Sequence, residues 1–169
     1  MTRRRRARRA IMRWFAAAGG VAITSCGAFA QPLTPAQLAP AIDAVVEGKI
    51  EERALLLGCA ANDAQLRDVV TNGWRNMRTT LSALLWAADF PGDHVRGVIA
   101  RTDPEKMPPL ASEKSPSCDQ PVFAARREEF GVETWSNELR AMFKALQLPY
   151  ALLPPNSEQW ARVKESVAR

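Results

Sequence analysis

The feature that most constrains the fold is a stripe of apolar residues that repeats along residues 66–88. Its members, spaced by three or four residues, are Leu66, Val70, Trp74, Met77, Leu81, Leu84 and Ala88. Because an α-helix has about 3.6 residues per turn, this spacing places all of them on one helical face. Asn62 is a favoured cap just upstream, with Asp63 in the first turn, and Phe90-Pro91-Gly92 stops the pattern. We predict one long helix with this face in the core.

A second helix is predicted to begin at Thr34-Pro35-Ala36-Gln37. Thr34 is a good cap, Pro35 suits the first helical position, and Gln37 completes a capping box. Apolar residues then recur toward Gly58, which fits termination. Gly48 is a weak point, where this segment would divide into two helices.

The C-terminal half shows the same helical spacing. Residues 122–148 carry the series Val132, Trp135, Leu139, Met142 and Leu146. Gly131 marks a kink or break before this series, and Pro149 ends it. Asn156 is a candidate cap for a last helix with Trp160, Val163 and Val167 on one face, and residues 93–101 fit a short helix.

No alternating apolar pattern indicates a strand, and no internal repeat is evident. We therefore predict an all-α fold, a single-domain bundle of about four main helices over residues 31–169. No segment of this domain holds a run of apolar residues long enough to span a membrane.

Residues 102–121 form a proline-rich connection between the predicted helices. They include Pro104, Pro108, Pro109, Pro116 and Pro121. Cys118 lies in this connection, and Cys59 lies at the end of the first predicted helix. A disulfide between them would close a loop of about 60 residues and contribute about 4 kcal/mol. We predict this bond as a staple of the loop; the alternative is a pair of free or metal-binding thiols.

The first thirty residues have the composition of a bacterial export signal. Seven arginines precede an apolar run over residues 14–23, and Ala28-Phe29-Ala30 supplies a small-residue cleavage pattern. We expect residues 1–30 to be removed as an export signal peptide. The protein would then reside in the periplasm or another exported location.

Two details of this signal leave alternatives open. Ile23-Thr24-Ser25-Cys26 resembles a lipobox, in which lipidation of Cys26 would anchor the protein to a membrane. Arg8-Arg9 loosely resembles the twin-arginine motif of a pathway that exports folded proteins, as opposed to ordinary secretion.

Removal of the signal changes the charge balance. The full chain has 23 basic and 18 acidic residues, and residues 1–30 contain seven of the basic and none of the acidic ones. The remaining domain therefore carries two more acidic than basic residues. This balance, together with the lack of a basic stripe interleaved with aromatics, argues against nucleic acid as a partner.

The residues that usually carry catalysis form no convincing set. His94 is the only histidine, and a lone histidine near Asp89 and Asp93 is more typical of a surface position than of a metal site. The carboxylate clusters are Glu51-Glu52 and Glu128-Glu129 with Glu133. Arg126 and Arg127 beside Glu128 indicate a solvated helix face with local ion pairs. No cofactor is predicted.

Trp86 and Phe90 fall off the apolar stripe of the long helix, next to Pro91. This second aromatic patch is either covered by another element or exposed as a binding surface. A binding surface is plausible chemistry here because tryptophan is enriched where binding energy concentrates. We take Trp86, Phe90 and Pro91 as the candidate binding residues.

The functional expectation is a non-catalytic, exported accessory or binding protein that contacts another envelope protein. The alternatives are a carboxylate-based periplasmic enzyme and a small subunit of an exported redox complex, which the twin-arginine resemblance favours.

Overall fold

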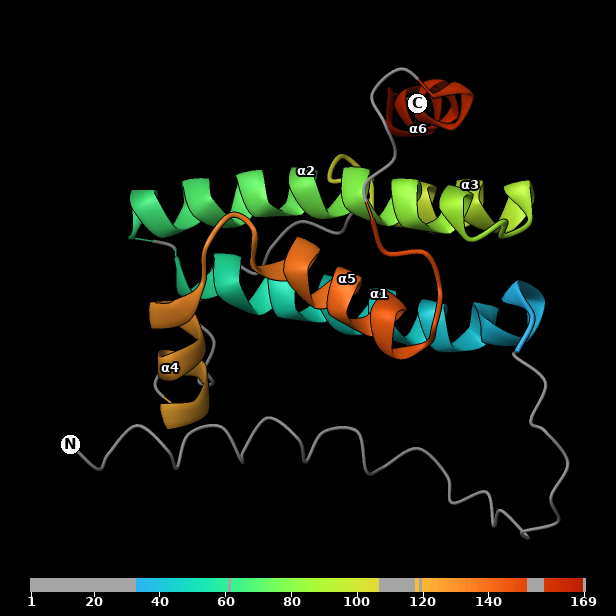
Figure 1. Ribbon diagram of the computed structural model, residues 1–169. Helices are drawn as coiled ribbons and strands as arrows, with labels where there is room; N and C mark the ends of the chain where they lie inside the picture. Colours follow the sequence, from blue (N-terminus) through green and yellow to red (C-terminus); the bar gives the residue numbers. More distant parts are fainter. Residues whose placement is uncertain (1–32, 61, 107–117, 119, 152–156, 169) are drawn as a thin grey trace, which may run out of the picture. The chain divides into compact units, whose positions relative to one another are not determined.

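The computed structural model describes residues 33–60, 62–106, 118, 120–151 and 157–168, all within the compact unit Leu33–Arg169. Within these ranges there are six helices and no strand (Figure 1), so the all-α class is confirmed. The helices are α1 (Pro35–Cys59), α2 (Ala64–Ala87), α3 (Gly92–Arg101), α4 (Pro121–Glu129), α5 (Thr134–Ala145) and α6 (Glu158–Ala168).

Several sequence predictions lie outside the described residues. They concern the export signal over residues 1–30 with Cys26, residues 107–117 of the proline-rich connection, and the cap Asn156. None of the described helices combines the length and apolar character that a membrane span requires.

Helix α1 begins with the predicted capping box. The Thr34 side chain accepts a hydrogen bond from the Gln37 backbone N–H, and the Gln37 side chain accepts one from the Thr34 N–H at 2.8 Å. The helix then runs unbroken through Gly48 to Cys59, so the division at Gly48 does not occur. A Cβ added to Gly48 would meet no atom within 4 Å. Gly48 therefore lies on an open side of the helix.

Helix α2 is capped one residue later than expected. Asp63, not Asn62, is its N-cap and accepts from the Leu66 backbone N–H at 2.9 Å. All seven residues of the predicted stripe are buried. The helix ends at Ala87, and Asp89 then adopts a positive φ of 54° that turns the chain toward α3.

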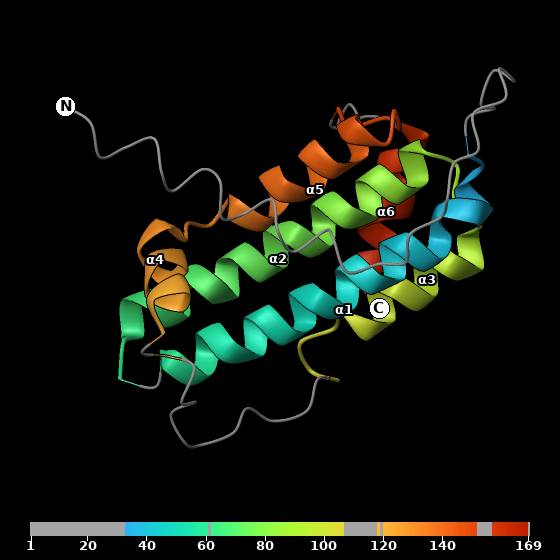
Figure 2. The same cartoon turned by 90° about the horizontal axis from the view of Figure 1, so that it is seen from below.

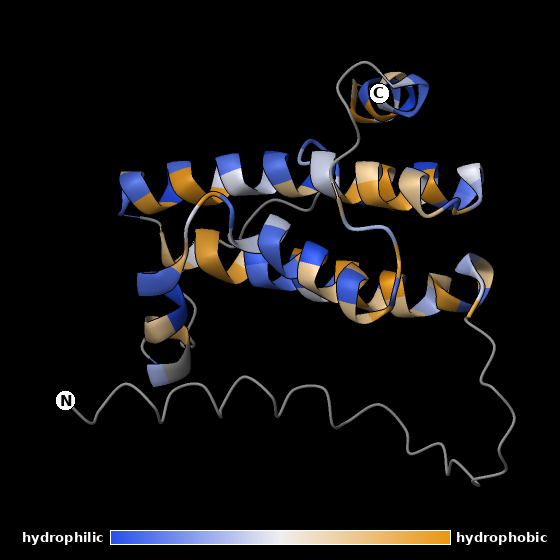
Figure 3. Cartoon of the chain, viewed as in Figure 1, coloured by the Kyte–Doolittle hydropathy of each residue, from blue (hydrophilic) through white to orange (hydrophobic). Residues whose placement is uncertain are grey.

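Helix α2 is the centre of this unit. It packs against α1, α3, α5 and α6, and α1 and α2 lie side by side in antiparallel directions (Figures 1 and 2). Every residue from Thr80 to Leu85 is buried. This half of α2 is coloured mainly as hydrophobic in Figure 3. A helix that is buried all round in this way must be covered by neighbours on several sides.

The segment predicted as helical over residues 122–148 forms two helices, α4 and α5. The break falls at residues 130–133, where the Gly131 N–H donates to Thr134 Oγ1 at 2.8 Å. The break near Gly131 is thus confirmed. The prediction of about four main helices is not confirmed, because six helices are present in the described part of the chain.

A tryptophan pair joins α5 to α2. Trp135 and Trp74 are both buried, and their rings meet edge to face with centroids 5.3 Å apart. Gly73 permits the close approach, because a Cβ there would lie 3.3 Å from the backbone oxygen of Val132. The Trp74 Nε1–H donates to the Thr102 backbone oxygen at 2.8 Å, so its polar atom is satisfied in the core.

The predicted disulfide between Cys59 and Cys118 is present. Their Cα atoms lie 5.5 Å apart, and the bond connects residues separated by 59 positions. It links the C-terminal end of α1 to the residues that precede α4. The partly exposed helix α4 is therefore held covalently as well as by packing.

Candidate functional site

The three candidate binding residues lie at the end of α2 and in the turn to α3, in different environments. Trp86 is half-buried, Pro91 is exposed, and Phe90 is only 3% exposed. The Phe90 ring stacks on His94 with centroids 5.6 Å apart and lies 6.5 Å from the ring of Phe143 in α5. Of the two alternatives for this patch, covering by another element therefore applies to Phe90, which packs near Phe143 of α5.

A groove of about 510 Å³ lies beside Trp86, between α2, α3 and α6. Its walls include Trp86, the apolar Ile99 and Ala100 of α3, and Arg162 of α6. The Arg162 guanidinium lies 5.8 Å from the centre of the Trp86 ring. A Cβ at Gly92 would come within 3.3 Å of this ring. The lack of a side chain there therefore allows Trp86 to lie against the α2–α3 turn.

Arg78 is the buried cation of this groove. It is 8% exposed, and its Nη2 donates to the Ile99 backbone oxygen at 3.3 Å, which links α2 to α3. Burial lowers the pKa of Arg78, while the carboxylate of Asp103 acts in the opposite direction. Arginine remains charged under all ordinary conditions, so the groove contains a buried positive charge.

Two buried donors at the groove make no hydrogen bond with the described residues. They are Nε of Arg78 and Nε1 of Trp86. A buried donor without a partner costs roughly 1–3 kcal/mol. Both atoms are shielded from solvent, so an acceptor in the groove would reach them only if neighbouring side chains moved.

The rim of the groove is rich in exposed cations. The side chains of Arg96, Lys106 and Arg162 are 57%, 62% and 53% exposed. Each forms a local ion pair, with Asp93, Asp103 and Glu158 respectively, at 2.5, 3.5 and 3.0 Å. Exposed pairs of this kind are worth little, and their cations can exchange partners readily.

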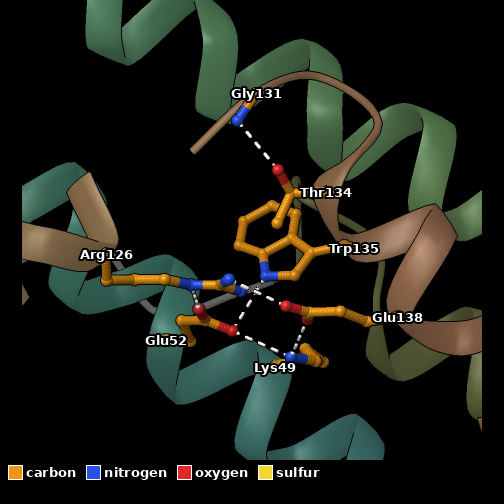
Figure 4. Close-up of polar contacts among 7 residues, drawn as sticks. All are labelled: Lys49, Glu52, Arg126, Gly131, Thr134, Trp135 and Glu138. Carbon is orange, nitrogen blue, oxygen red and sulfur yellow. Dashed lines mark hydrogen bonds and ion pairs between the residues drawn. The ribbon is translucent and has the colours of Figure 1, made fainter. Parts of the chain in front are cut away.

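A second polar feature is a partly buried ionic cluster where α1, α4 and α5 meet (Figure 4). Glu52 of α1 accepts from Arg126 Nε of α4 at 2.5 Å and from Trp135 Nε1 of α5 at 2.9 Å. Lys49 lies 3.0 Å from Glu52 and 2.6 Å from Glu138, and Arg126 also pairs with Glu138 at 2.8 Å. Two cations and two carboxylates therefore neutralise each other.

Burial alone would raise the pKa of Glu52, but Lys49, Arg126 and Trp135 outweigh that effect and hold it below the usual range. Burial alone would lower the pKa of Arg126, but its hydrogen bonds to Glu138 and Glu52 outweigh that effect and raise the pKa. Glu52 is therefore an ionised, fully engaged carboxylate. Its arrangement is that of a structural link between three helices.

The other predicted carboxylates do not gather around Glu52. Glu51, Glu128, Glu129 and Glu133 are exposed, and Glu133 accepts from the Asn76 side chain at 3.0 Å. Ion pairs were expected between neighbouring residues of α4, but its arginines instead pair with carboxylates that are distant in the sequence. Arg126 pairs with Glu52 and Glu138, and Arg127 pairs with Asp63 at 3.2 Å.

His94 is half-buried against Phe90, and its Nε2 is buried without a hydrogen-bond partner among the described residues. Asp89 and Asp93 near it are exposed. The described part of the chain contains no group of three or more His, Cys, Asp or Glu side chains able to hold a metal ion.

No protein family, curated protein or solved structure matches the chain.

Sequence reasoning identified Trp86 but missed the cations around it. Arg78 carried a signal, because it lies four residues after Trp74 and three before Leu81, on the apolar side of the helix. An arginine at such a position is either paired in the core or placed toward a cavity. Arg96, Lys106 and Arg162 carried no signal, because they reach the groove only through the packing of α3, the turn that follows it and α6 against α2.

Proposed function

We propose that this protein is an exported, non-catalytic accessory protein that contacts another envelope protein through the groove beside Trp86. The observation that carries the proposal is the groove itself. It brings the half-buried Trp86 together with the exposed Ala100 of α3 and the guanidinium of Arg162. Tryptophan and arginine at the centre of a pocket are the residues that most often dominate binding energy.

The location in the periplasm or envelope is supported by the export signal pattern and by the Cys59–Cys118 disulfide. Structural disulfides persist mainly in oxidising compartments. The intact mass of the protein purified from its native envelope tests this part. A chain that lacks residues 1–30 supports export, a mass that fits acylated Cys26 supports a lipid anchor, and a chain that retains Met1 contradicts both.

The carboxylate-enzyme alternative has less support. A glycosidase needs a general acid whose pKa is raised, within a cleft that holds a second carboxylate. Glu52, a partly buried carboxylate, has a lowered pKa and three donors bound to it. The pKa of the buried Asp103 is lowered as well. Both carboxylates are poorly suited to donate a proton. The redox-subunit alternative rests on the twin-arginine pattern alone.

Site-specific photocrosslinking tests the proposed contact. A photoreactive benzoylphenylalanine at position 100, which is exposed and lines the groove, should crosslink to one envelope protein in intact cells. The same group at position 55, on α1 and also exposed, serves as the control. The proposal fails if position 100 yields no discrete product, or if both positions yield the same set.

The identified partner then allows a measurement of affinity. We expect Trp86→Ala to weaken binding by about 2 kcal/mol or more, the usual cost of removing a central aromatic anchor. Trp160→Ala is the matched control, because Trp160 is also half-buried but does not line the groove. Trp86 packs against the core, so circular dichroism must show that the variant keeps its helical spectrum.

A further inference from the structure

We propose that helix α6 is a detachable cover of α2, which opens as a unit while α1, α2, α3 and α5 stay folded. Its opening exposes the α2 face that carries Arg78, Ser82 and Trp86, and so controls access to the tryptophan. The opening follows from how α6 is packed. Only the statement about access to Trp86 rests on the proposed function.

Helix α6 buries few of its own side chains. Val163 is its one buried residue, whereas α5, with 12 residues against 11, has four: Trp135, Ser136, Leu139 and Phe143. Both helices pack mainly on α2. Because hydrophobic stabilisation is proportional to the apolar area removed from water, α6 is held to α2 less strongly than α5 is.

The contact between α2 and α6 includes a polar pair of small side chains. The hydroxyl groups of Ser82 in α2 and Ser166 in α6 share a hydrogen bond of 2.7 Å. When α6 leaves, both hydroxyls can bond to water, so the net contribution of this bond to the closed state is small. The ion pair between Arg162 and Glu158 lies within α6 and does not hold the helix to α2.

The interface is also imperfectly filled. A groove of about 510 Å³ lies between α6 and the helices α2 and α3. The side chains that line it lack the packing partners that a filled interface would supply. Beside the groove, Nε of Arg78 and Nε1 of Trp86 are buried without a hydrogen-bond partner among the described residues, which destabilises the closed arrangement. Low local stability of this kind is the basis of local opening.

The contacts on the other sides of α2 do not depend on α6. When α6 leaves, α2 keeps α1, α3 and α5 as neighbours. The edge-to-face pair of Trp74 and Trp135 and the hydrogen bond between Thr80 and Ser136 both join α2 to α5. These contacts would persist, so the opening of α6 is local.

Helix α6 also covers part of the tryptophan that the proposed contact uses. The guanidinium of Arg162 lies 5.8 Å from the centre of the Trp86 ring, and Trp86 is half-buried. The opening of α6 removes this arginine and exposes the ring more fully. Access to Trp86 is therefore greater in the open state than in the closed state.

Thiol labelling at two matched positions tests the opening. Ser82 and Ser136 are both fully buried, and their hydroxyls bond across the α2–α6 and α2–α5 contacts respectively. A cysteine at either position, in the protein expressed from its full-length sequence, reacts with iodoacetamide only when it is exposed. Mass spectrometry of the peptide that carries the position gives the rate.

We expect Ser82→Cys to react at least about tenfold faster than Ser136→Cys in native buffer, a difference of about 1.4 kcal/mol between the two opening free energies. Its rate should depend little on urea, because a local opening exposes little surface. Equal rates with the same urea dependence would show that both positions open only by global unfolding, and would overturn the proposal.

Hydrogen exchange of the unsubstituted protein separates the opening of a whole helix from fraying of its end. The backbone N–H groups of residues 162–168 should exchange through one common event, faster than those of α2 and α5. Protection that falls off gradually toward residue 168 would indicate fraying of the terminus, and the opening of α6 as a unit would then be wrong.

A covalent lock tests the control of access. Ser82→Cys combined with Ser166→Cys should form a disulfide, because the two side-chain oxygens lie only 2.7 Å apart. The locked protein should lose the crosslink from position 100 by about tenfold or more relative to Ser166→Cys alone, since the open fraction falls. If the locked protein crosslinks as before, access is not controlled by α6, while the proposed function stands. No crosslink in either form would refute the proposed function, and with it the control of access, but not the opening.

Discussion

At the scale of single residues, Glu52 shows how a largely buried carboxylate is kept ionised. Its side chain is 19% exposed, and it accepts hydrogen bonds from Lys49, Arg126 and Trp135. These donors come from α1, α4 and α5, so one side chain links three helices. Removing the charge of Glu52 would leave Lys49 and Arg126 to share the single carboxylate of Glu138.

We predict that Glu52→Gln lowers the free energy of unfolding at neutral pH by about 1–3 kcal/mol, because an amide nitrogen would face two cations. The pKa of Glu52 lies below its ordinary value of 4.5 in the folded protein. Its stabilising effect is therefore complete above that pH and is lost as the pH falls toward the folded pKa.

The difference in stability between Glu52→Gln and the natural protein should accordingly shrink in acid. Urea unfolding followed by circular dichroism at neutral and acidic pH measures it. Glu51→Gln is the control, since Glu51 is adjacent but exposed, and it should change the stability little at either pH. A difference that stays constant with pH would contradict the assignment of a lowered pKa.

The Glu52 cluster could not be predicted from the sequence, although some of its members belong to charge clusters that the sequence shows. Glu51-Glu52 and the charged run from Arg126 to Glu129 are visible as charge clusters, and the natural interpretation of such runs is a solvated helix face. That interpretation holds for Glu128 and Glu129, which are exposed, but not for Arg126. Arg126 and Glu52 are 74 positions apart, and only the packing of α4 beside α1 brings them together.

At the scale of helices, the glycines of α2 and α3 play opposite parts. Gly73 of α2 is buried beside the α4–α5 connection, where a Cβ would lie 3.3 Å from the Val132 backbone oxygen and 3.7 Å from the Trp135 ring. Gly97 of α3 is exposed, and a Cβ there would meet no atom within 4 Å. The first glycine is required by packing, and the second only weakens its helix.

We predict that Gly73→Ala destabilises the protein by about 1–3 kcal/mol, because the added methyl group forces the α4–α5 connection away from α2. Gly97→Ala should stabilise it by about 0.5–1 kcal/mol, through the higher helix propensity of alanine. Thermal unfolding of the two variants should therefore shift the midpoint in opposite directions. A stabilising Gly73→Ala would show that the connection moves freely.

The helices themselves were largely predictable, because their signals are local. The stripe along α2, the capping box of α1 and the short helix α3 depend on spacing and on cap residues within a few positions. The errors are local too. Asn62 and Asp63 are both good caps, and the choice of Asp63 depends on which one places its oxygen at the Leu66 N–H. The burial of Phe90, by contrast, depends on Phe143 in a distant segment, so the sequence left covered and exposed positions open for it.

At the scale of the whole molecule, the Cys59–Cys118 bond ties the first long helix to the C-terminal half. Its loop of 59 residues contains α2 and α3. In the chain-entropy model, such a loop contributes about 4 kcal/mol by restricting the unfolded chain. The part of the fold most dependent on the bond is α4, because it is short and Cys118 directly precedes it.

We predict that Cys59→Ser or Cys118→Ser lowers the free energy of unfolding by about 2–5 kcal/mol. Hydrogen exchange should accelerate most in α4, while α2 stays protected. Reduction of the natural protein should give the same loss, and adding a reductant to either variant should change nothing further. Equal stability before and after reduction would show that the bond adds nothing to the fold.

The central position of α2 has a consequence for the order of folding. Helices α1, α2 and α3 are consecutive in the chain and pack against one another. Because contacts between neighbours in sequence form fastest, we expect this three-helix portion to form first. We expect substitutions of residues at the interface of α1 and α2 to slow refolding. Substitutions on α6 should mainly speed unfolding. Stopped-flow measurements of both rates test this order. The groove beside Trp86 needs α6 as one wall, and it would therefore be the last part of the protein to form.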